Sequence, residues 1–446
     1  MQNADAAFSH SLSSIFRTFM PTGLFFRLLA LLCSLAMAGT AHAEDGTPSV
    51  RIHGFGTIGL SHADTNFGGS FARDASQIPG GTGLQFKNDS RLGIQANAQL
   101  TNQIELVTQL VARSRFATGK DTDAIEWAFA SFRPSDDVNL RIGRVGADLY
   151  MLSDYRNVGI GYTTVRPPVD FYGVMSLGSL DGLDVTKTWV TDRAQWKLKA
   201  FAGNSNFQAA DMRGPFKGIG GLVLARESDG FTIRGTYANG NIHLRAPDFE
   251  LLRTGLGQLI SLTRYTLPNV AAQAQTLMDG SEHENVRVRY LTMGASYDKH
   301  DWVAQAEIMR IQSNSGIAAG KGAYALVGKR LGDWTPYLGI SQLRSVTPPY
   351  IAPNWGKDLA PFAPIIGASA VAQAQYVGQE ATARLNAWRV DQRTISLGAR
   401  WDVTPTAALK FQLDRVIVKP QGTLLWQGQP GGGRAWVGSM ALDFMF

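Results

Sequence analysis

The sequence has a single cysteine, Cys33, and its position leaves no disulfide to the folded part of the chain. Cys33 lies in an apolar run, LLALLCSLAMAG, that ends shortly before an A-x-A pattern at 41–43. This arrangement predicts a secretory signal peptide over residues 1–43, and Met20 is a second candidate for the start of translation. We expect residues 44–446 to form one exported domain that contains no disulfide.

Long hydrophobic runs and blocks of basic residues are also missing. No run of about 18 apolar residues follows the predicted signal peptide, so no transmembrane helix is expected. The net charge of +6 is mild, and no cluster of five or six lysines and arginines occurs, so we expect no nucleic-acid partner. A membrane protein without such helices must be a closed barrel, because only closure satisfies every backbone polar group in lipid.

The motifs of common enzyme and cofactor sites are absent as well. Gly54 to Gly59 spells G-x-G-x-x-G, but a Gly/Asn/Ser-rich stretch follows where a dinucleotide site needs a helix. The histidines after the signal peptide are far apart and lack zinc-site spacing: His53, His62, His243, His283 and His300. We therefore expect no enzyme activity, no cofactor and no metal ion, although sequence separation alone does not exclude a metal or nucleophile site.

What the sequence does have is alternation of apolar and polar residues in segments of about ten. Short polar turns are predicted at 101–102, 134–137, 191–192, 227–230, 298–301, 332–333 and 402–405. Longer loops are predicted near 62–82, 114–123, 146–181, 203–215, 239–284, 312–320, 344–391 and 418–433. Seven turns and eight loops join sixteen strands, which predicts an all-β fold: a 16-stranded antiparallel transmembrane β-barrel with the short turns on the periplasmic side.

A soluble β-sandwich is the alternative, because it gives the same alternation with the apolar residues inward. Tryptophans close to the short turns favour the barrel, since aromatic residues form girdles at membrane interfaces: Trp189, Trp196, Trp302, Trp334 and Trp401. Two loop stretches, 249–262 and 368–388, are rich in Ala, Leu and Gln without strand alternation. They predict either short helices at the outer rim or disordered loops.

The most unusual stretch runs from Val138 to Tyr172. It begins as an alternating strand and continues as a long loop that is polar and aromatic. We predict that this third extracellular loop folds into the lumen of the barrel. The candidate constriction residues are Asp148, Tyr150, Asp154, Tyr155 and Arg156.

Charged residues in the inward phase of the strands are the candidate pore wall, since fixed charges set which ions a water-filled pore favours. The predicted inward cations are Arg51, Arg91, Arg113, Arg141, Lys197, Lys199 and Arg234. The predicted inward acids are Glu105, Glu126, Asp184, Glu307 and Asp443, and Arg144 is added to the predicted pore wall. The alternative is that these charges only keep a wide lumen hydrated.

Several segments together resemble the trimeric porins of Gram-negative outer membranes. They are V-R-I-H-G-F-G at 50–56, R-L-G-I-Q-A-N-A-Q-L at 91–100, L-R-I-G-R at 140–144, S-L-G-A-R-W-D at 396–402 and the final Phe446. The resemblance implies a third outer loop that narrows the pore, basic wall residues opposite acidic loop residues, and a homotrimer. It places Asp148, Asp154 and Tyr155 in that loop and Arg91, Arg113 and Arg141 on the wall. The loop departs from the family pattern in having few acids and arginines of its own, Arg156 and Arg166.

The predicted function is passive diffusion of small hydrophilic solutes and ions across the outer membrane, with a weak anion preference. One alternative is a channel specific for an anionic or aromatic nutrient, bound by Tyr150, Tyr155 and the arginines. Another is a barrel whose long loops, 239–284 and 344–391, act as an adhesin or receptor. The expected partners are outer-membrane lipid, lipopolysaccharide and two further copies of the chain.

Overall fold

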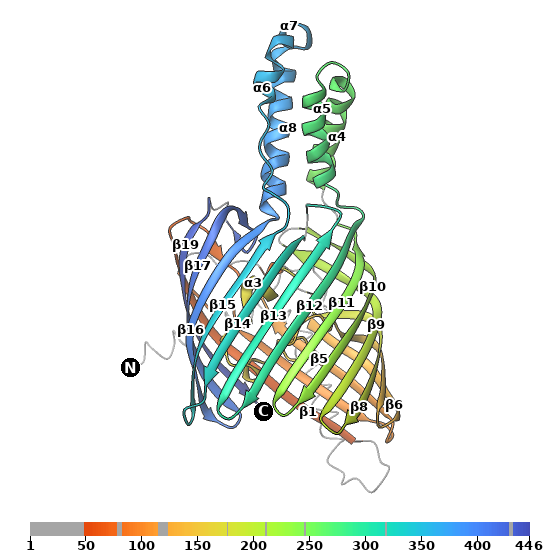
Figure 1. Cartoon of the computed structure of the whole chain (residues 1–446), viewed down its shortest axis with the longest axis vertical. Coiled ribbons are helices and arrows are strands. Elements are labelled where there is room, and N and C mark those ends of the chain that lie inside the picture. Colours follow the sequence, from red (N-terminus) through yellow and green to blue (C-terminus); the bar gives the residue numbers. More distant parts are fainter. Residues whose placement is uncertain are drawn as a thin grey trace, which may run out of the picture.

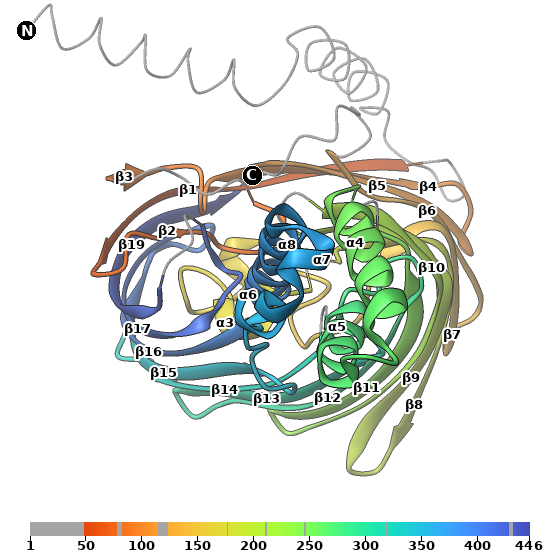
Figure 2. The ribbon, with the colours of Figure 1, turned by 90° about the horizontal axis from the view of Figure 1, so that it is seen from above.

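The computed structural model describes residues 49–77, 83–114, 124–175, 177–209, 212–244, 247–316, 319–427 and 431–446. The predicted signal peptide lies outside these ranges. Sixteen long strands form one closed antiparallel sheet (Figures 1 and 2), in which each strand pairs with the next and β19 pairs with β1. They are β1 (Ser49–Thr65), β4 (Arg91–Gln99), β5 (Ile104–Arg113), β6 (Ile125–Ser135), β7 (Val138–Gly146), β8 (Ser179–Thr191), β9 (Ala194–Ala209), β10 (Met212–Ser228), β11 (Phe231–Ile242), β12 (Val286–Lys299), β13 (Trp302–Ser313), β14 (Gly320–Lys329), β15 (Trp334–Ser345), β16 (Val390–Thr404), β17 (Ala407–Thr423) and β19 (Gly433–Met445).

Three two-residue strands accompany the barrel. β3 (Leu84–Gln85) pairs with the outer end of β1. β2 (Ser70–Phe71) pairs with β18 (Trp426–Gln427), which joins the first long loop to the last one. The number of long strands and their antiparallel order agree with the predicted 16-stranded barrel.

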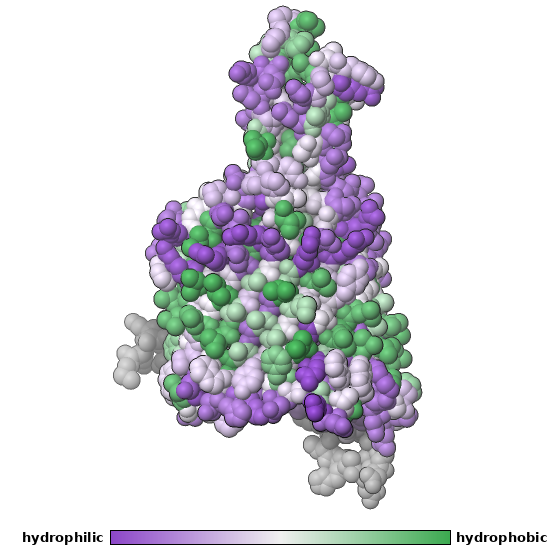
Figure 3. Space-filling model, in the orientation of Figure 1, coloured by the Kyte–Doolittle hydropathy of each residue, from purple (hydrophilic) through white to green (hydrophobic). Residues whose placement is uncertain are grey.

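The apolar side chains of the strands point outward. Ile142, Ile308 and Leu397 each leave about 60% of their surface exposed, and Figure 3 shows an apolar band across one face of the barrel between two hydrophilic zones. The opposite phase of the strands turns polar side chains such as Thr57 and Asp443 into the interior, where they are buried. This inside-out pattern is that of a transmembrane barrel and excludes the β-sandwich alternative.

The turns and the aromatic girdle follow the prediction. All seven predicted short turns join consecutive strands at one end of the barrel. Beside them, Trp189 stacks on Trp196 with ring centroids 6.1 Å apart, and Trp334 stacks on Trp401 at 5.4 Å. The stretch near 203–215 was predicted to be a loop, but most of it is strand. β9 and β10 pair with each other as far as Ala209 and Met212.

Two of the long loops fold into helices that rise above the opposite end of the barrel (Figure 1). They are α4 (Pro247–Thr263) and α5 (Pro268–Gly280) in one loop, and α6 (Trp355–Asp358), the 3-10 turn Ala360–Phe362, α7 (Ala363–Ile366) and α8 (Ala368–Ala387) in the other. We call these helices the helical tower. The two stretches for which short helices or disordered loops were predicted form α4 and α8, and α5, α6 and α7 were not predicted. None of the helices that the structure describes is long and apolar enough to cross a membrane.

The tower has a small core of its own. Trp355 is fully buried there, and its indole Nε1 donates a hydrogen bond to Oε1 of Gln273 on α5, 2.8 Å away. Buried Leu256, Ala274 and Leu385 come from α4, α5 and α8. The two long loops therefore pack against each other instead of lying as independent segments.

Candidate functional site

The described residues of the connection between β7 and β8, 147–175 and 177–178, lie inside the barrel, and we call them the inner loop. Figure 2 shows its helix α3 (Val169–Tyr172) within the ring of strands; a 3-10 turn, Gly159–Gly161, precedes it. Ion pairs and hydrogen bonds join the inner loop to strands on opposite sides of the lumen: β9, β13, β17 and β19. The inward fold predicted for this loop is therefore present in the structure.

Asp148 fastens the start of the inner loop. Its carboxylate accepts hydrogen bonds from Nζ of Lys199 on β9, 2.6 Å away, and from the guanidinium of Arg234 on β11. Burial alone would raise the pKa of Asp148, but the two cations outweigh it and hold the pKa well below its usual range. Asp148 is therefore negatively charged and paired with two fixed cations. Because its side chain is buried, it does not present this charge to solvent in the lumen.

Asp170 fastens helix α3 by different chemistry. Its carboxyl oxygens accept hydrogen bonds from Ser341 Oγ at 2.7 Å, Thr394 Oγ1 at 3.0 Å and the amide of Gln392. None of these donors is charged, and burial raises the pKa of Asp170. This anchor therefore depends on neutral hydrogen-bond donors from β15 and β16.

Arg166 joins the inner loop to two other parts of the molecule. Its guanidinium donates to both carboxylate oxygens of Asp89 at 2.8 and 2.7 Å, and to Asp414 on β17 at 3.2 Å. It also stacks over the ring of Phe71, 5.1 Å from the centroid. Because Asp89 and Phe71 belong to the first long loop, Arg166 holds that loop and the inner loop against the same wall.

Lys410 of β17 holds the 3-10 turn. Its Nζ donates to the carbonyl oxygens of Gly159 at 2.7 Å and Thr164 at 3.0 Å, and forms an ion pair with Asp443 of β19 at 3.0 Å. Lys410 and Asp443 are both fully buried. Gly159 permits this approach, since a Cβ atom at that position would lie 1.8 Å from Oδ1 of Asp443.

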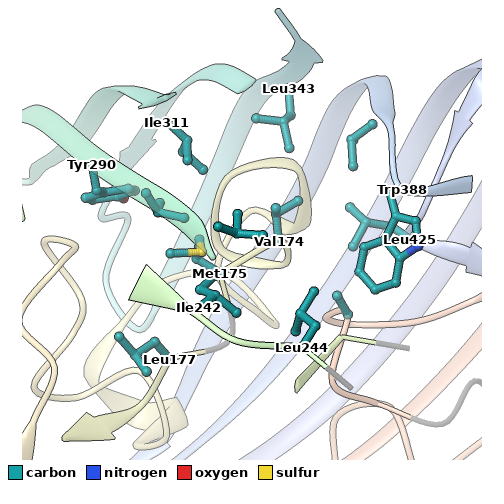
Figure 4. Packing of buried hydrophobic residues seen from close by; sticks show 14 of the residues in the cluster. Val174, Met175, Leu177, Ile242, Leu244, Tyr290, Ile311, Leu343, Trp388 and Leu425 are labelled. Carbon is teal, nitrogen blue, oxygen red and sulfur yellow. The ribbon is translucent and has the colours of Figure 1, made fainter. Parts of the chain in front are cut away.

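An aromatic cluster packs the middle of the inner loop against β12 to β14. The ring of Tyr150 lies 4.6 Å from that of Tyr172 and 5.7 Å from that of Tyr290. Glu307 of β13 accepts hydrogen bonds from the backbone N–H of Met151 and from the hydroxyl groups of Tyr172 and Tyr324. Figure 4 shows further apolar contacts at the end of the loop: Val174, Met175, Leu177, Ile242 and Leu244.

The predicted constriction residues therefore fall into two groups. Asp148 and Tyr150 are buried anchors, and Arg156 is also buried, donating from Nη1 to the carbonyl of Leu177 at 3.1 Å. Asp154 and Tyr155 remain exposed. Within the predicted set, only these last two present their side chains to solvent from the inner loop.

The predicted wall arginines Arg91, Arg113 and Arg141 occupy the inward phase, and each is already engaged. Arg91 is buried and donates from Nε to the carbonyl of Asn157 in the inner loop at 2.6 Å. Arg113 forms an ion pair with Asp74 at 3.2 Å. Arg141 forms a bidentate ion pair with Asp184 of β8, with a shortest distance of 2.6 Å. The charges of Arg113 and Arg141 are therefore paired with carboxylates, and Arg91 is engaged by neutral acceptors.

The structure contradicts the predicted position of Arg144 in the pore wall. It stands three residues after Arg141, and an odd number of residues along a strand turns a side chain to the opposite face. Arg144 therefore lies on the outer surface of the barrel, where its Nε pairs with Asp181 of β8 at 2.7 Å.

Glu105 lies in the lumen at the end of the barrel with the short turns. It accepts a hydrogen bond from Asn97 at 2.9 Å and forms ion pairs with Arg133 at 3.1 Å and Arg51 at 3.5 Å. Side-chain exposure is 9% for Glu105, 51% for Arg133 and 64% for Arg51. The acid is covered, and the two arginines present positive charge to solvent.

Sequence reasoning missed several groups that hold the inner loop. Asp170, Lys410 and Asp414 were not singled out, and Arg166 appeared only as an exception to a family pattern. Strand phase could have placed Lys410 and Asp414 in the lumen, because both alternate with outward Phe411 and Leu413. No sequence signal indicates which loop atoms they would reach.

The depressed pKa values of Asp148 and Asp89 predict how acid affects inner-loop docking. An aspartate whose pKa is lowered by folding stabilises the folded state above its unfolded pKa, about 3.9, and this contribution disappears as the pH falls through its folded pKa. Asp170 has the opposite sign: its raised pKa favours docking below about pH 4 and weakens it as the pH rises. We therefore expect docking not to weaken as the pH falls from neutral to about pH 4, where protonation of Asp170 adds to it, and to weaken in stronger acid as Asp148 and Asp89 are protonated.

Hydrogen-exchange protection factors of inner-loop amides, corrected for the intrinsic pH dependence, would measure this. Asp148→Asn is the matched variant and should flatten the acid-dependent loss. Protection that falls between pH 7 and pH 5 would contradict the assignment, since neither lowered carboxyl pKa lies in that range.

No protein-family model and no curated protein sequence matches this chain. Similarity is found among solved structures. Salmonella typhi OmpF in complex with daunomycin is 12% identical with a TM-score of 0.51, over 91% of this chain and 99% of that one. The outer membrane channel DcaP of Acinetobacter baumannii is 11% identical with a TM-score of 0.51, again over 91% and 99%. The anion-selective porin from Comamonas acidovorans is 11% identical with a TM-score of 0.50, over 90% and 100%.

These structures share the architecture over nearly their whole length, and at such low identity the likeness concerns the fold. The resemblance to Gram-negative outer-membrane porins that the sequence motifs suggested is confirmed at that level. The subfamily is not placed.

Proposed function

We propose that this protein is an outer-membrane porin that passes small hydrophilic solutes and ions by passive diffusion, with no enzyme activity. The observation that carries the proposal is the inside-out barrel whose inner loop is fastened to opposite lumen walls. Such a loop sets a size limit on what crosses the lumen, and the fixed charges around it act on ions. The similar structures titled as a channel and as a porin support this assignment.

A weak anion preference is the finer part of the proposal. Arg51 and Arg133 are more than half exposed in the lumen, and the one carboxylate between them, Glu105, is covered. This group therefore presents a net positive charge to passing ions. Arg91, Arg113 and Arg141 are proposed to act differently, by holding the inner loop and the wall in place, because each already has a partner.

Replacing both exposed arginines, Arg51→Gln with Arg133→Gln, should shift ion selectivity toward cations while conductance persists. The experiment is single-channel recording of the purified protein in a planar bilayer under a salt gradient, with the reversal potential as the readout. The matched control, Lys187→Gln with Lys299→Gln, removes two cations from the outer surface near the same end of the barrel. An unchanged reversal potential in the lumen variant would remove these arginines as the source of selectivity.

The same recordings test the main proposal. Stepwise currents that grow linearly with salt and show no solute-dependent block support a general porin. Saturable block by an anionic or aromatic solute would instead indicate a substrate-specific channel, with exposed Tyr155 and Asp154 as the first candidates for contact. A folded barrel that never conducts would overturn the channel assignment.

We propose a homotrimer in the outer membrane. The outward face of β4 and β6 carries small residues, which let two barrel walls approach closely: Ala96, Ala98, Ala128 and Ala130. Native mass spectrometry of the detergent-extracted protein measures the assembly directly. A monomer mass under conditions that keep the barrel folded would refute the trimer.

Lipid phosphates, such as those of lipopolysaccharide, are the proposed partners of the outer rim. Arg310, Lys321 and Arg344 stand directly opposite one another on β13, β14 and β15, on the outward face. Like charges in register destabilise a sheet unless anions lie between them. Figure 3 shows a hydrophilic zone directly above the apolar band. Loss of co-purifying lipopolysaccharide when the three residues become Gln is the expected result.

A second candidate function is the binding of a cell-surface or soluble partner by the helical tower. Its upper part exposes large apolar side chains: Leu262, Tyr265 and Ile365, each more than three-quarters exposed. Deleting the tower should abolish such binding and spare conductance. Loss of conductance on deletion would instead make the tower part of the permeation path.

A further inference from the structure

We propose that Glu250, His283 and Glu284 form a binding site for one divalent transition-metal ion of the Zn²⁺ type at the base of the helical tower. Glu250 lies near the start of α4, and His283 and Glu284 lie in the short connection between α5 and β12. The two segments are far apart in the sequence and meet where the α4–α5 hairpin joins the barrel. This inference goes beyond the proposed function and does not depend on it.

The three side chains bring one ligand atom each to a common point. A ring nitrogen of His283 and a carboxylate oxygen from each glutamate all lie within 4.8 Å of one another. Around a tetrahedral Zn²⁺ with bonds of about 2.0 to 2.2 Å, ligand atoms stand roughly 3.4 Å apart. Glu250 and Glu284 are both exposed and can make the small remaining movement.

The orientation of His283 is the second and independent observation. The imidazole is only 2% exposed, and its Nδ1 lies 3.0 Å from the carbonyl oxygen of Ser281. A carbonyl oxygen can only accept, so Nδ1 carries the hydrogen and Nε2 carries the lone pair. This is the arrangement by which a backbone carbonyl fixes a metal-binding histidine.

Nε2 of His283 is buried and finds no hydrogen-bond partner among the residues that the structure describes. A buried polar atom left unpaired costs about 1 to 3 kcal/mol, so such atoms are uncommon unless something else satisfies them. A metal ion coordinated by Nε2 and the two carboxylates would do so. Phe249 packs beside the ring, with centroids 6.0 Å apart, and helps to hold its plane.

The donor set indicates which ions fit. One imidazole nitrogen and two carboxylate oxygens suit Zn²⁺, which commonly takes three protein ligands and a water molecule. Mg²⁺ and Ca²⁺ prefer oxygen ligands alone and would gain little from the imidazole. Arg253 of α4 pairs with Glu282, at 3.8 Å, and the two ligand carboxylates keep their charge for a dication.

A bound ion would link α4 directly to the segment that follows α5. The α4–α5 hairpin enters and leaves the barrel rim at this point, so the ion would close its base and fix its angle to the barrel. Hydrogen bonds from Arg253 Nη1 to the carbonyl of Met278 at 2.8 Å and to Ser281 Oγ at 3.1 Å already connect the same two segments. The metal would strengthen an existing joint.

The test is equilibrium dialysis of the purified full chain, stripped with chelator, against Zn²⁺ with metal analysis of the protein. We expect one ion per chain, retained in excess Mg²⁺. Co²⁺ should give the visible absorption of a tetrahedral nitrogen and oxygen site, a signature that surface adsorption does not produce. Glu250→Gln with Glu284→Gln should abolish binding over the concentration range that saturates the wild type.

Two further variants keep the result interpretable. His283→Ala should also abolish binding, but His283 is buried and its loss can disturb the fold. The variant of the two exposed glutamates is therefore the decisive one. Asp279→Asn with Asp358→Asn removes two exposed carboxylates from the tower and should bind like the wild type. Equal binding by the glutamate variant and the wild type, or no specific binding by the wild type, would overturn the proposal.

Discussion

Replacing Lys410 by methionine is expected to release the 3-10 turn of the inner loop from the barrel wall. The ammonium group is fully buried, is paired with Asp443 and donates to backbone carbonyls of Gly159 and Thr164. Removing one partner of a buried ion pair costs about 3 to 5 kcal/mol, because the other charge stays buried without compensation. At 1.4 kcal/mol per tenfold, the docked-to-released ratio should fall by roughly a hundredfold or more.

Single-channel conductance and hydrogen exchange measure this change together. We expect larger and noisier current steps and loss of protection for amides near Gly159, with the barrel strands still protected. Lys329→Met is the matched control, since this lysine is exposed on the outer surface of β14 and its loss should change neither readout.

The double variant Lys410→Met with Asp443→Asn separates two contributions. If the uncompensated carboxylate dominates, removing its charge should restore part of the docking. If the unmet loop carbonyls dominate, the double variant should behave like the single one. Wild-type conductance in Lys410→Met would show that the other anchors hold the loop without this lysine.

The barrel was predictable because a side chain on a strand can point to only one of the two faces of the sheet. Once a strand is recognised, its period of two fixes which residues face the lumen, and the inward phase predicted for Arg51, Lys199, Arg234 and Glu307 is present in the structure. The same rule shows why Arg144 was misplaced, since it is an odd number of positions from Arg141. The turns were predictable for a related reason: their polar residues interrupt the alternation.

The contacts of the inner loop could not be predicted from the sequence, for a different reason. Alternation places Arg91 or Lys410 in the lumen but does not say whether a loop atom reaches it. Those partners are set by the path of the loop, which carries no period. Asp170, for example, is bound by β15 and β16 residues far along the chain. Expecting the wall arginines to be free charges was therefore reasonable from the strands alone, but each has a partner in the structure: Asn157 for Arg91, Asp74 for Arg113 and Asp184 for Arg141.

Two tyrosines of the inner loop are expected to respond in opposite ways to truncation. Tyr150 is 1% exposed, packs against Tyr172 and Tyr290, and donates its hydroxyl to the carbonyl of Met175 at 3.2 Å. Tyr155, five positions later in the same loop, is 39% exposed. Tyr150→Ala leaves a cavity and should weaken loop docking by about 3 to 5 kcal/mol. Tyr155→Ala should change it by no more than about 0.5 kcal/mol.

Protection of inner-loop amides gives the docking free energy, and solute flux through reconstituted protein gives permeation. Tyr150→Ala should lose protection across the loop and admit larger solutes, because the size limit depends on the docked loop. Tyr155→Ala should keep full protection and alter flux only for solutes that touch its ring. If the two variants lose protection equally, the aromatic cluster does not hold the loop. The polar anchors at Asp148, Arg166 and Lys410 would then account for the docking by themselves.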